Sequence, residues 1–218
     1  VATTHTQARY VLPEVVKAFR TRYPGVHLAL HQSSPGHIAE MVAEGVADIG
    51  ISTEGLDRHP GLMSFPSHSW QLCVLVPVGH PLAAGGSLSL ESMAAYPIVT
   101  YDRAFAGRMR IDVAFAAAGL NPDVVLTAID ADIIKTYVEA GLGVGIVTEM
   151  AVDAQRDTHL VKLSTRHLFG PIMSRIAIRR GGYLRPYAED FLRQVVQPAF
   201  RDQLRLPHEK PARVLATS

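Results

Sequence analysis

The sequence predicts an α/β protein of two similar lobes, each a mainly parallel sheet covered by helices. Strand-like and helix-like segments alternate along the chain with short connections, which is typical of parallel sheets with helices on their faces. The same rhythm restarts after Gly79-His80-Pro81, as though a second lobe began there. A chain of 218 residues is long enough for one large domain or for two small lobes.

The helices of the first lobe are predicted from the helical spacing of apolar residues, and its strands from the alternation of apolar and polar residues. Turn residues mark where these elements begin and end. Tyr23-Pro24-Gly25 is a strong helix stop, and Ser34-Pro35 is a typical helix start. In order, we expect a helix over 11–19, a half-buried strand over 26–31, a helix from 34 to about 45 and a strand over 47–52.

The second half of the chain repeats these signals and ends with a strand and a helix that could return to the first lobe. We expect strands over 70–77, 98–101, 124–128, 144–147, 160–163 and 172–179, and helices over 90–95, 107–118, 130–140 and 187–204. Residues 206–218 are polar and contain proline, so a frayed tail is expected.

The composition is that of a globular protein, with 48% hydrophobic and 19% charged residues. A formal net charge of +1 gives no basic field to hold a phosphate backbone, so tight DNA binding by this chain is not expected. The sequence contains neither a signal-peptide pattern at its start nor an apolar run of membrane-spanning length, which favours a cytoplasmic location.

Several motifs that could indicate catalysis or cofactor binding have a simpler explanation. The glycines of Gly141-Leu-Gly-Val-Gly145 follow a helix and precede a strand, the reverse of a dinucleotide loop, and so predict a helix cap and a tight strand entry. Asp130 and Asp132 open a helix, where capping is favoured over catalysis. Because no nucleophile stands beside a base, we expect no enzyme, no catalytic residues and no cofactor.

Metal and thiol chemistry are not expected either. His27 and His31 fall on a predicted strand, where their spacing separates them by about 13 Å, too far for one ion. The lone cysteine, Cys73, lies in an apolar run and is interpreted as a buried, inert thiol.

The most informative segment is Thr3-Thr4-His5-Thr6-Gln7, which directly precedes the first predicted helix. Hydroxyls and free backbone N–H groups converge there on a point that stabilises an anion. Ordinary capping by one threonine explains the same residues, and the two interpretations stay open. Ligands of open α/β sheets bind beyond the carboxyl ends of strands, where Thr53 and, in the second lobe, Thr100 and Tyr101 are expected.

Five segments together closely resemble the CysB-like branch of the LysR-type transcriptional regulators, over residues 1 to about 200. They are Thr3-Thr-His-Thr-Gln-Ala-Arg-Tyr-Val-Leu-Pro13, Tyr23-Pro24, Ala47-Asp48, Pro97-Ile-Val-Thr-Tyr101 and Asp130-Ala-Asp-Ile-Ile-Lys-Thr-Tyr137. The resemblance implies a fold like type II periplasmic binding proteins, with two Rossmann-like lobes joined by two crossing strands near 70–74 and 172–176. It divides the chain into lobe I (1–71), lobe II (72–172), a return to lobe I (173–205) and the tail (206–218).

The resemblance also implies an effector site between the lobes. Its expected ligands are Thr4, Thr6, Gln7 and Thr53, with Trp70 close by and Thr100 and Ala106 from the second lobe. The CysB-like branch commonly has Phe-Thr-Gly-Arg where this chain has Phe105-Ala106-Gly107-Arg108. One lost hydroxyl weakens anion binding roughly 10- to 100-fold unless Arg103, Arg108 or a water compensates.

The implied effectors are sulfate, thiosulfate, O-acetylserine and N-acetylserine, which control genes of cysteine synthesis, sulfur assimilation or sulfonate use. The implied partners are further copies of the chain, with paired sensing domains and a tetrameric full-length protein, and DNA only through an N-terminal helix-turn-helix that this chain lacks. Two other hypotheses stay open: a solute-binding protein of a transport system, and an enzyme on the same scaffold.

Overall fold

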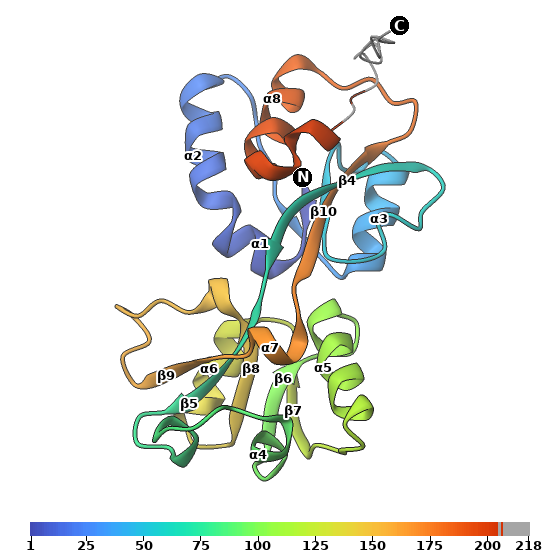
Figure 1. Cartoon of the computed structure of the whole chain (residues 1–218). Coiled ribbons are helices and arrows are strands. Elements are labelled where there is room, and N and C mark those ends of the chain that lie inside the picture. Colours follow the sequence, from blue (N-terminus) through green and yellow to red (C-terminus); the bar gives the residue numbers. More distant parts are fainter. Residues whose placement is uncertain (205, 207–218) are drawn as a thin grey trace, which may run out of the picture.

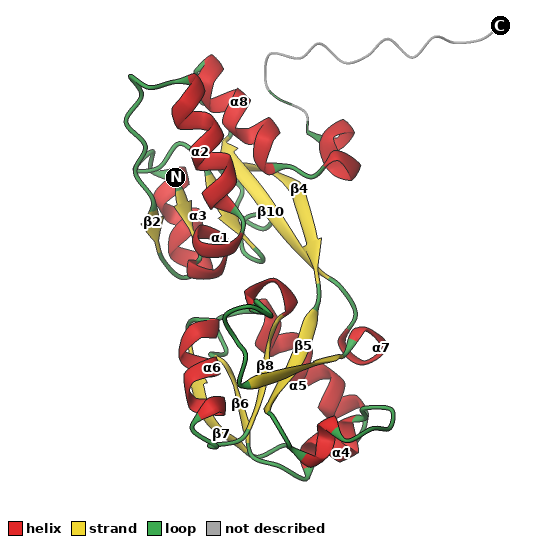
Figure 2. Ribbon diagram, turned by 90° about the vertical axis from the view of Figure 1, so that its left-hand side faces the viewer, coloured by secondary structure: helices red, strands yellow, loops and turns green. Residues whose placement is uncertain are grey.

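The computed structural model describes residues 1–204 and 206, and these residues form two lobes stacked end to end (Figure 1). Each lobe contains one five-stranded sheet, in the orders β2-β1-β3-β10-β4 and β7-β6-β8-β5-β9. Strands β4 and β10 run side by side toward the second lobe (Figure 2). The expected two-lobed α/β architecture with two crossing strands is therefore confirmed.

The first lobe combines the start of the chain with its last strand and helix. Its strands are β1 (Ala2–Thr3), β2 (His31–Gln32), β3 (Gly50–Ser52), β4 (Leu62–Trp70) and β10 (Ile172–Arg179). Its helices are α1 (His5–Tyr10), α2 (Leu12–Arg22), α3 (Pro35–Ala43) and α8 (Pro186–Val195), followed by the 3-10 helix η3 (Pro198–Gln203).

The second lobe is formed by the middle of the chain. Its strands are β5 (Leu72–Pro77), β6 (Ile98–Tyr101), β7 (Val124–Ala128), β8 (Val144–Thr148) and β9 (Leu160–Ser164). Its helices are α4 (Leu90–Ala94), α5 (Ala106–Ala117), α6 (Ala131–Glu139) and α7 (Arg166–Phe169), with the 3-10 helices η1 (Pro81–Ala83) and η2 (Glu149–Ala151).

The sheets are mixed, which corrects the expectation of mainly parallel sheets. Strands β1, β2 and β3 are parallel, as are β6, β7 and β8. In contrast, β10 is antiparallel to β3 and β4, and β5 is antiparallel to β8 and β9. The antiparallel strands include those through which the chain passes between the lobes.

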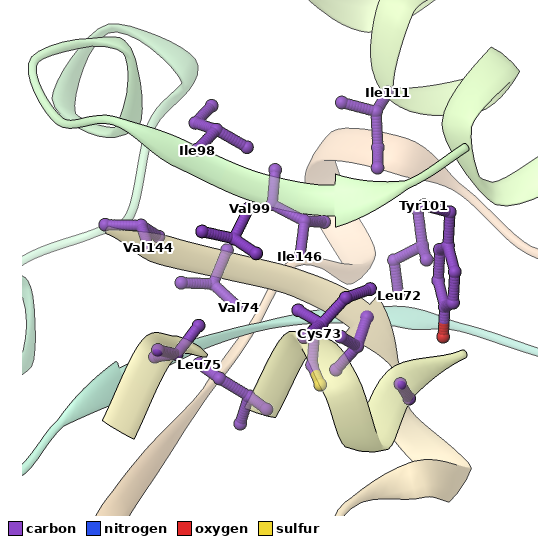
Figure 3. Packing of buried hydrophobic residues seen from close by; sticks show 14 of the residues in the cluster. Leu72, Cys73, Val74, Leu75, Ile98, Val99, Tyr101, Ile111, Val144 and Ile146 are labelled. Atoms are coloured by element: carbon purple, nitrogen blue, oxygen red, sulfur yellow. The ribbon is translucent and has the colours of Figure 1, made fainter. Parts of the chain in front are cut away.

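Each lobe has its own hydrophobic core. In the second lobe, β5, β6 and β8 pack their Val, Ile and Leu side chains against Ile111 of α5 (Figure 3). Ile134 of α6 belongs to the same core. Cys73 is 1% exposed in this core, and burial raises the pKa of its thiol to about 12, as expected for an inert side chain. In the first lobe, α2 and α8 pack through Phe19 and Phe191, whose ring centroids are 5.4 Å apart.

Two predicted elements were only partly right, and α1, β4 and α7 were not predicted. The first predicted helix is preceded by a separate one, α1, and the strand expected over 26–31 is paired only at His31–Gln32. Strand β4 was not predicted before residue 70. The terminal helix ends at Val195, because Pro198 lacks the backbone N–H needed to continue it. The predicted tail, 206–218, lies outside the described residues except for Leu206.

The glycines of 141–145, after α6, form the helix cap and the tight strand entry that their position predicts. Gly141 has a positive φ of 81°, a conformation that favours glycine at a helix end. At Gly143, a Cβ atom would lie 2.3 Å from the carbonyl oxygen of Pro97, so β8 can approach this backbone only without a side chain. Across residues 1–204 and 206, no helix is long and apolar enough to cross a membrane.

Candidate functional site

A small cavity lies between the lobes, at the carboxyl ends of β1 and β3. Four of its lining residues are polar groups of the first lobe, and Trp70 lies where β4 leaves that lobe. The full lining is Thr4, Thr6, Gln7, Thr53, Trp70, Tyr101, Phe105 and Gly107. In this arrangement the cavity holds about 20 Å³, space for about one water molecule. A larger guest therefore requires the side chains or the lobes to move apart.

The threonines before α1 are held at the cavity by the turn from β1 into the helix. Thr4 is the N-cap residue and is 4% exposed, yet its side chain makes no capping hydrogen bond. Its carbonyl oxygen accepts a hydrogen bond from the N–H of Ala8 at 3.1 Å. Because the Thr4 hydroxyl is not used in capping, it remains available to a ligand, and simple N-capping does not explain this residue.

Gln7 and Trp70 enter the cavity from α1 and β4 and meet at one hydroxyl. Gln7 Nε2 donates to Ser174 Oγ at 2.8 Å, and Trp70 Nε1 donates to the same oxygen at 3.0 Å. The side-chain oxygen of Gln7 is buried and has no hydrogen-bond partner among the described residues. An unpaired buried amide oxygen is costly, so the polar groups here are not all satisfied by the protein itself.

The second lobe contributes mainly aromatic surface to the cavity. Tyr101 ends β6, and its hydroxyl accepts a hydrogen bond from the N–H of Thr148 at 3.1 Å. Burial raises the pKa of Tyr101 and outweighs the opposing effects of Thr148 and of the Thr6 hydroxyl. Tyr101 is thus a neutral group, and its ring lies 6.4 Å from that of Phe105, between centroids.

A carboxylate of the first lobe reaches the start of α5. Glu54 Oε1 accepts a hydrogen bond from the N–H of Ala106 at 2.7 Å, and its other oxygen accepts one from Thr53 Oγ1. Burial raises the pKa of Glu54, although these two hydrogen bonds lower it in part. The backbone N–H at the position where the CysB-like branch commonly has threonine is therefore occupied by a protein carboxylate.

A second contact joins the lobes through α1 and α6. Tyr10 donates to Asp132 Oδ1 at 2.9 Å, and Arg9 Nε lies 2.7 Å from Asp132 Oδ2. Lys135 Nζ lies 3.1 Å from the same carboxylate. Burial alone would raise the pKa of Asp132, but the hydrogen bonds from Lys135 and Tyr10 and the charge of Arg9 outweigh burial and lower it.

The structure brings five of the seven expected effector ligands to one cavity: Thr4, Thr6, Gln7, Thr53 and Trp70. It does not bring Thr100 there, because this side chain is fully buried and its hydroxyl donates to the carbonyl oxygen of Ile146 at 2.9 Å. Ala106 is also not a lining residue, although its neighbours Phe105 and Gly107 are. The role of all seven as effector ligands stays a prediction.

The charged residues considered for the site lie elsewhere. Arg108 is 5% exposed, but its Nε lies 2.7 Å from Asp112 Oδ1 and its Nη1 donates to the carbonyl oxygen of Tyr101. Arg103 is exposed. Asp130 caps α6, since its carboxylate accepts a hydrogen bond from the N–H of Ile133 at 2.9 Å, which confirms the capping interpretation.

Sequence reasoning missed Phe105, Gly107, Glu54 and Ser174. The first two adjoin Ala106, so their position near the site could have been inferred from the resemblance. Glu54 directly follows Thr53 at the end of a predicted strand, which is a usable signal. No sequence pattern pointed to Ser174, because the alternation of apolar and polar residues along β10 does not reveal which strand pairs with β10. Within residues 1–204 and 206, no group of three His, Cys, Asp or Glu side chains could hold a metal ion.

Comparison with known proteins places the chain in a family. The model of the LysR substrate binding domain matches residues 1–199. The HTH-type transcriptional regulator SsuR of Burkholderia cenocepacia is 58% identical over 188 residues, which are 86% of this chain and 61% of that protein. The HTH-type transcriptional regulator CysB of the same organism is 49% identical over 86% of this chain and 60% of that protein.

A solved structure agrees with these relatives. The cofactor-binding domain of the Cbl transcriptional regulator matches with a TM-score of 0.88 at 46% identity, covering 93% of this chain and 89% of that one. This chain spans about three fifths of the length of the two regulators above. The family match and both identities lead to one conclusion: the chain belongs to the family of LysR substrate-binding domains.

Proposed function

We propose that the chain is the effector-sensing part of a LysR-type transcriptional regulator of sulfur assimilation, cysteine synthesis or sulfonate use. The observation that carries this proposal is the cavity between the lobes, where Thr4, Thr6, Gln7 and Thr53 converge. Its support from relatives is the similarity to SsuR and CysB, both transcriptional regulators. The effector is a small anion or acetylated amino acid: sulfate, thiosulfate, O-acetylserine or N-acetylserine.

The hydrogen-bond donors that line the cavity are uncharged, so they can bind an anion without forming an ion pair with it. The free hydroxyl of Thr4 and the hydroxyl of Thr6 donate to the oxyanion, and Thr53 does so once its proton is released from Glu54, while Tyr101 and Phe105 cover the cavity from the second lobe. A hydrogen bond to a charged group contributes about 1.5 to 3 kcal/mol. A few such bonds are sufficient for binding at metabolite concentrations.

Binding at this place acts on the arrangement of the lobes. The cavity receives side chains from both lobes, so a guest that touches both favours the arrangement in which they are close. A ligand shifts such an equilibrium only by its difference in affinity for the two arrangements. Paired sensing domains in a tetramer would transmit this shift to DNA-binding segments outside this chain, in the cytoplasm.

The main alternative is a solute-binding protein, which shares the two-lobed architecture. The regulators at 58% and 49% identity favour the sensor. The relatives are named as transcriptional regulators, which gives no support to an enzymatic role.

Titration calorimetry with each of the four metabolites tests the proposal. We expect saturable binding of at least one of them, with one site per chain, and a loss of about tenfold in affinity when Thr53→Val removes a hydroxyl. The matched control is Thr21→Val, because Thr21 is exposed on α2 and bonds only within its helix, to Lys17. Absence of binding by all four metabolites would overturn the proposal.

A further inference from the structure

Ser174 lies at an irregularity in the pairing of the two crossing strands. Ser174 of β10 pairs with His68 of β4, but the next residue, Arg175, pairs with Pro66, so Ser67 is an extra residue in β4. Bulges of this kind bend a strand, redirect side chains and are frequent beside binding sites. Ser174 is fully buried, and the irregularity places its hydroxyl between two side chains that line the cavity.

One hydroxyl thereby joins three elements of the first lobe. Ser174 Oγ of β10 is 2.8 Å from Gln7 Nε2 of α1 and 3.0 Å from Trp70 Nε1 of β4. Because Gln7 and Trp70 both line the cavity, the position of this hydroxyl fixes the distance between them. Ser174 itself is not a lining residue, so it can act on a ligand only through these two side chains.

The donors and acceptors of Ser174, Trp70 and Gln7 determine which hydrogen bonds the Gln7 amide can form. An indole N–H can only donate, so Ser174 must accept from Trp70. Ser174 accepts from Gln7 as well, which leaves its own proton unused in both bonds, and Gln7 Oε1 is buried without a partner among the described residues. Turning the Gln7 amide by half a turn occupies the same volume, since its oxygen and nitrogen are nearly equal in size.

After that turn the Ser174 proton and the Gln7 oxygen bond to each other. The N–H₂ group of Gln7 then takes the place of the buried oxygen and is free to donate to an oxyanion in the cavity that Gln7 lines. The turned amide gives the buried oxygen a donor with or without a ligand, and a bound anion stabilises it further by adding a charge-assisted hydrogen bond.

We propose that Ser174 is a positioning residue of the effector site, which holds Trp70 in place and orients the Gln7 amide toward a bound oxyanion. This inference rests on the proposed function, since it needs an anion in the cavity. Hydrogen bonds then run from Trp70 to Ser174, from Ser174 to Gln7 and from Gln7 to the ligand.

Ser174→Ala tests the inference by calorimetry with sulfate and with N-acetylserine. We expect about tenfold weaker binding of whichever anion the unaltered chain binds, and recovery in Ser174→Thr, which restores a hydroxyl. Ser67→Ala is the matched control, because Ser67 is a buried serine of β4 whose hydroxyl contacts His68 and no lining residue. If Ser174→Ala fails to fold, as judged by circular dichroism, Ser174→Cys takes its place.

Trp70 supplies a second readout that a merely structural role would not change. It is the sole tryptophan of the chain, so a nitrogen-15 spectrum of the protein contains one indole N–H signal. We expect ligand-free Ser174→Ala to shift this signal and to speed its exchange with water, while Ser67→Ala leaves it in place. Unaltered affinity together with an unmoved indole signal in Ser174→Ala would overturn the inference. If the unaltered chain itself binds neither anion, the proposed function fails instead.

Discussion

At the scale of single residues, Thr4 and Thr100 show that a threonine hydroxyl can have different roles. The hydroxyl of Thr100 donates to a strand carbonyl and belongs to the sheet. The Thr4 side chain makes no capping bond and faces the cavity. Thr4 was expected at the site because it precedes the first predicted helix, and Thr100 because it lies at the end of a predicted strand. Only the structure shows which hydroxyl is already used.

Ala106 gives the most specific prediction at this scale. Ala106→Thr places a hydroxyl at the start of α5, where the CysB-like branch commonly has one. We expect sulfate binding to strengthen about tenfold or more, because a hydrogen bond to a charged group contributes about 1.5 to 3 kcal/mol. Calorimetry measures the change, and Ala104→Thr, at an exposed position of the same loop, is the control. Equal affinity in the two variants would show that position 106 does not contact the anion.

His68 predicts how stability depends on pH. It is 4% exposed, its Nε2 has no partner among the described residues, and burial lowers its pKa from 6.5 to about 4. The unfolded chain therefore binds more protons than the folded chain between pH 6.5 and 4. The free energy of unfolding should fall by about 3 kcal/mol as the pH drops through this window.

Chemical denaturation at a series of pH values measures this effect. In His68→Gln the side chain cannot titrate, so the free energy of unfolding should depend less steeply on pH between 6.5 and 5. His31→Gln, at an exposed position of β2, should keep the slope of the unaltered chain. Equal slopes in all three proteins would mean that His68 is protonated in the folded state.

From the sequence, a site residue could be predicted only where a polar side chain stands next to the end of a predicted helix or strand. Thr4, Thr6 and Gln7 directly precede a predicted helix and belong to the quoted resemblance, Thr53 closes a predicted strand, and the structure brings the four together. Ser174 reaches the same site from the other end of the chain, through a strand pairing that no local pattern reveals. Glu54 is polar and follows a strand, but its bond to Ala106 depends on how the lobes meet.

At the scale of elements, the pattern of apolar residues predicted most helices and strands, because each of these elements must bury an apolar face. The strands Ile98–Tyr101, Val124–Ala128 and Ile172–Arg179 have the predicted bounds. The pattern failed for β4, which contains Pro66 and four polar side chains. This strand lies at the edge of its sheet, where a proline is tolerated because one side of the strand needs no partner. Helix α1 was missed because its six residues carry no apolar stripe.

Gly143 provides the prediction for this scale. Gly143→Ala puts a Cβ atom against the Pro97 carbonyl, and the backbone on neither side can yield without disturbing the pairing of β6 with β8. We expect the free energy of unfolding to fall by about 3 kcal/mol. Thermal denaturation measures the loss. Gly25→Ala is the control, since a Cβ atom added there would meet no other atom within 4 Å and its φ is not positive, and a similar loss in both variants would contradict the account.

At the scale of the whole molecule, two polar contacts join the lobes. Glu54 bonds to Ala106, and Asp132 bonds to Tyr10 and Arg9. These contacts stabilise the arrangement in which the cavity is small. A ligand that bridges the lobes therefore binds to an arrangement close to the one that the protein already favours, opened only as far as the ligand's size requires.

Asp132→Asn tests this coupling. The substitution removes the charge that attracts Arg9 and weakens the bond from Tyr10, so the arrangement with separated lobes should become more populated. We expect ligand affinity to fall about fivefold, corresponding to a loss of about 1 kcal/mol, and small-angle X-ray scattering to show a larger radius of gyration without ligand. Asp123→Asn, in the loop before β7, is the control. An unchanged radius and affinity would show that Asp132 does not hold the lobes together.

The central claim is that a small anion or acetylated amino acid binds between the lobes at the threonines. A crystal structure of the chain with the tightest binder among the four metabolites tests this claim most directly. The account predicts electron density for the ligand within hydrogen-bond distance of Thr4, Thr6 and Thr53. Density for the ligand at another place, with these hydroxyls pointing apart and side chains filling the cavity, would contradict it.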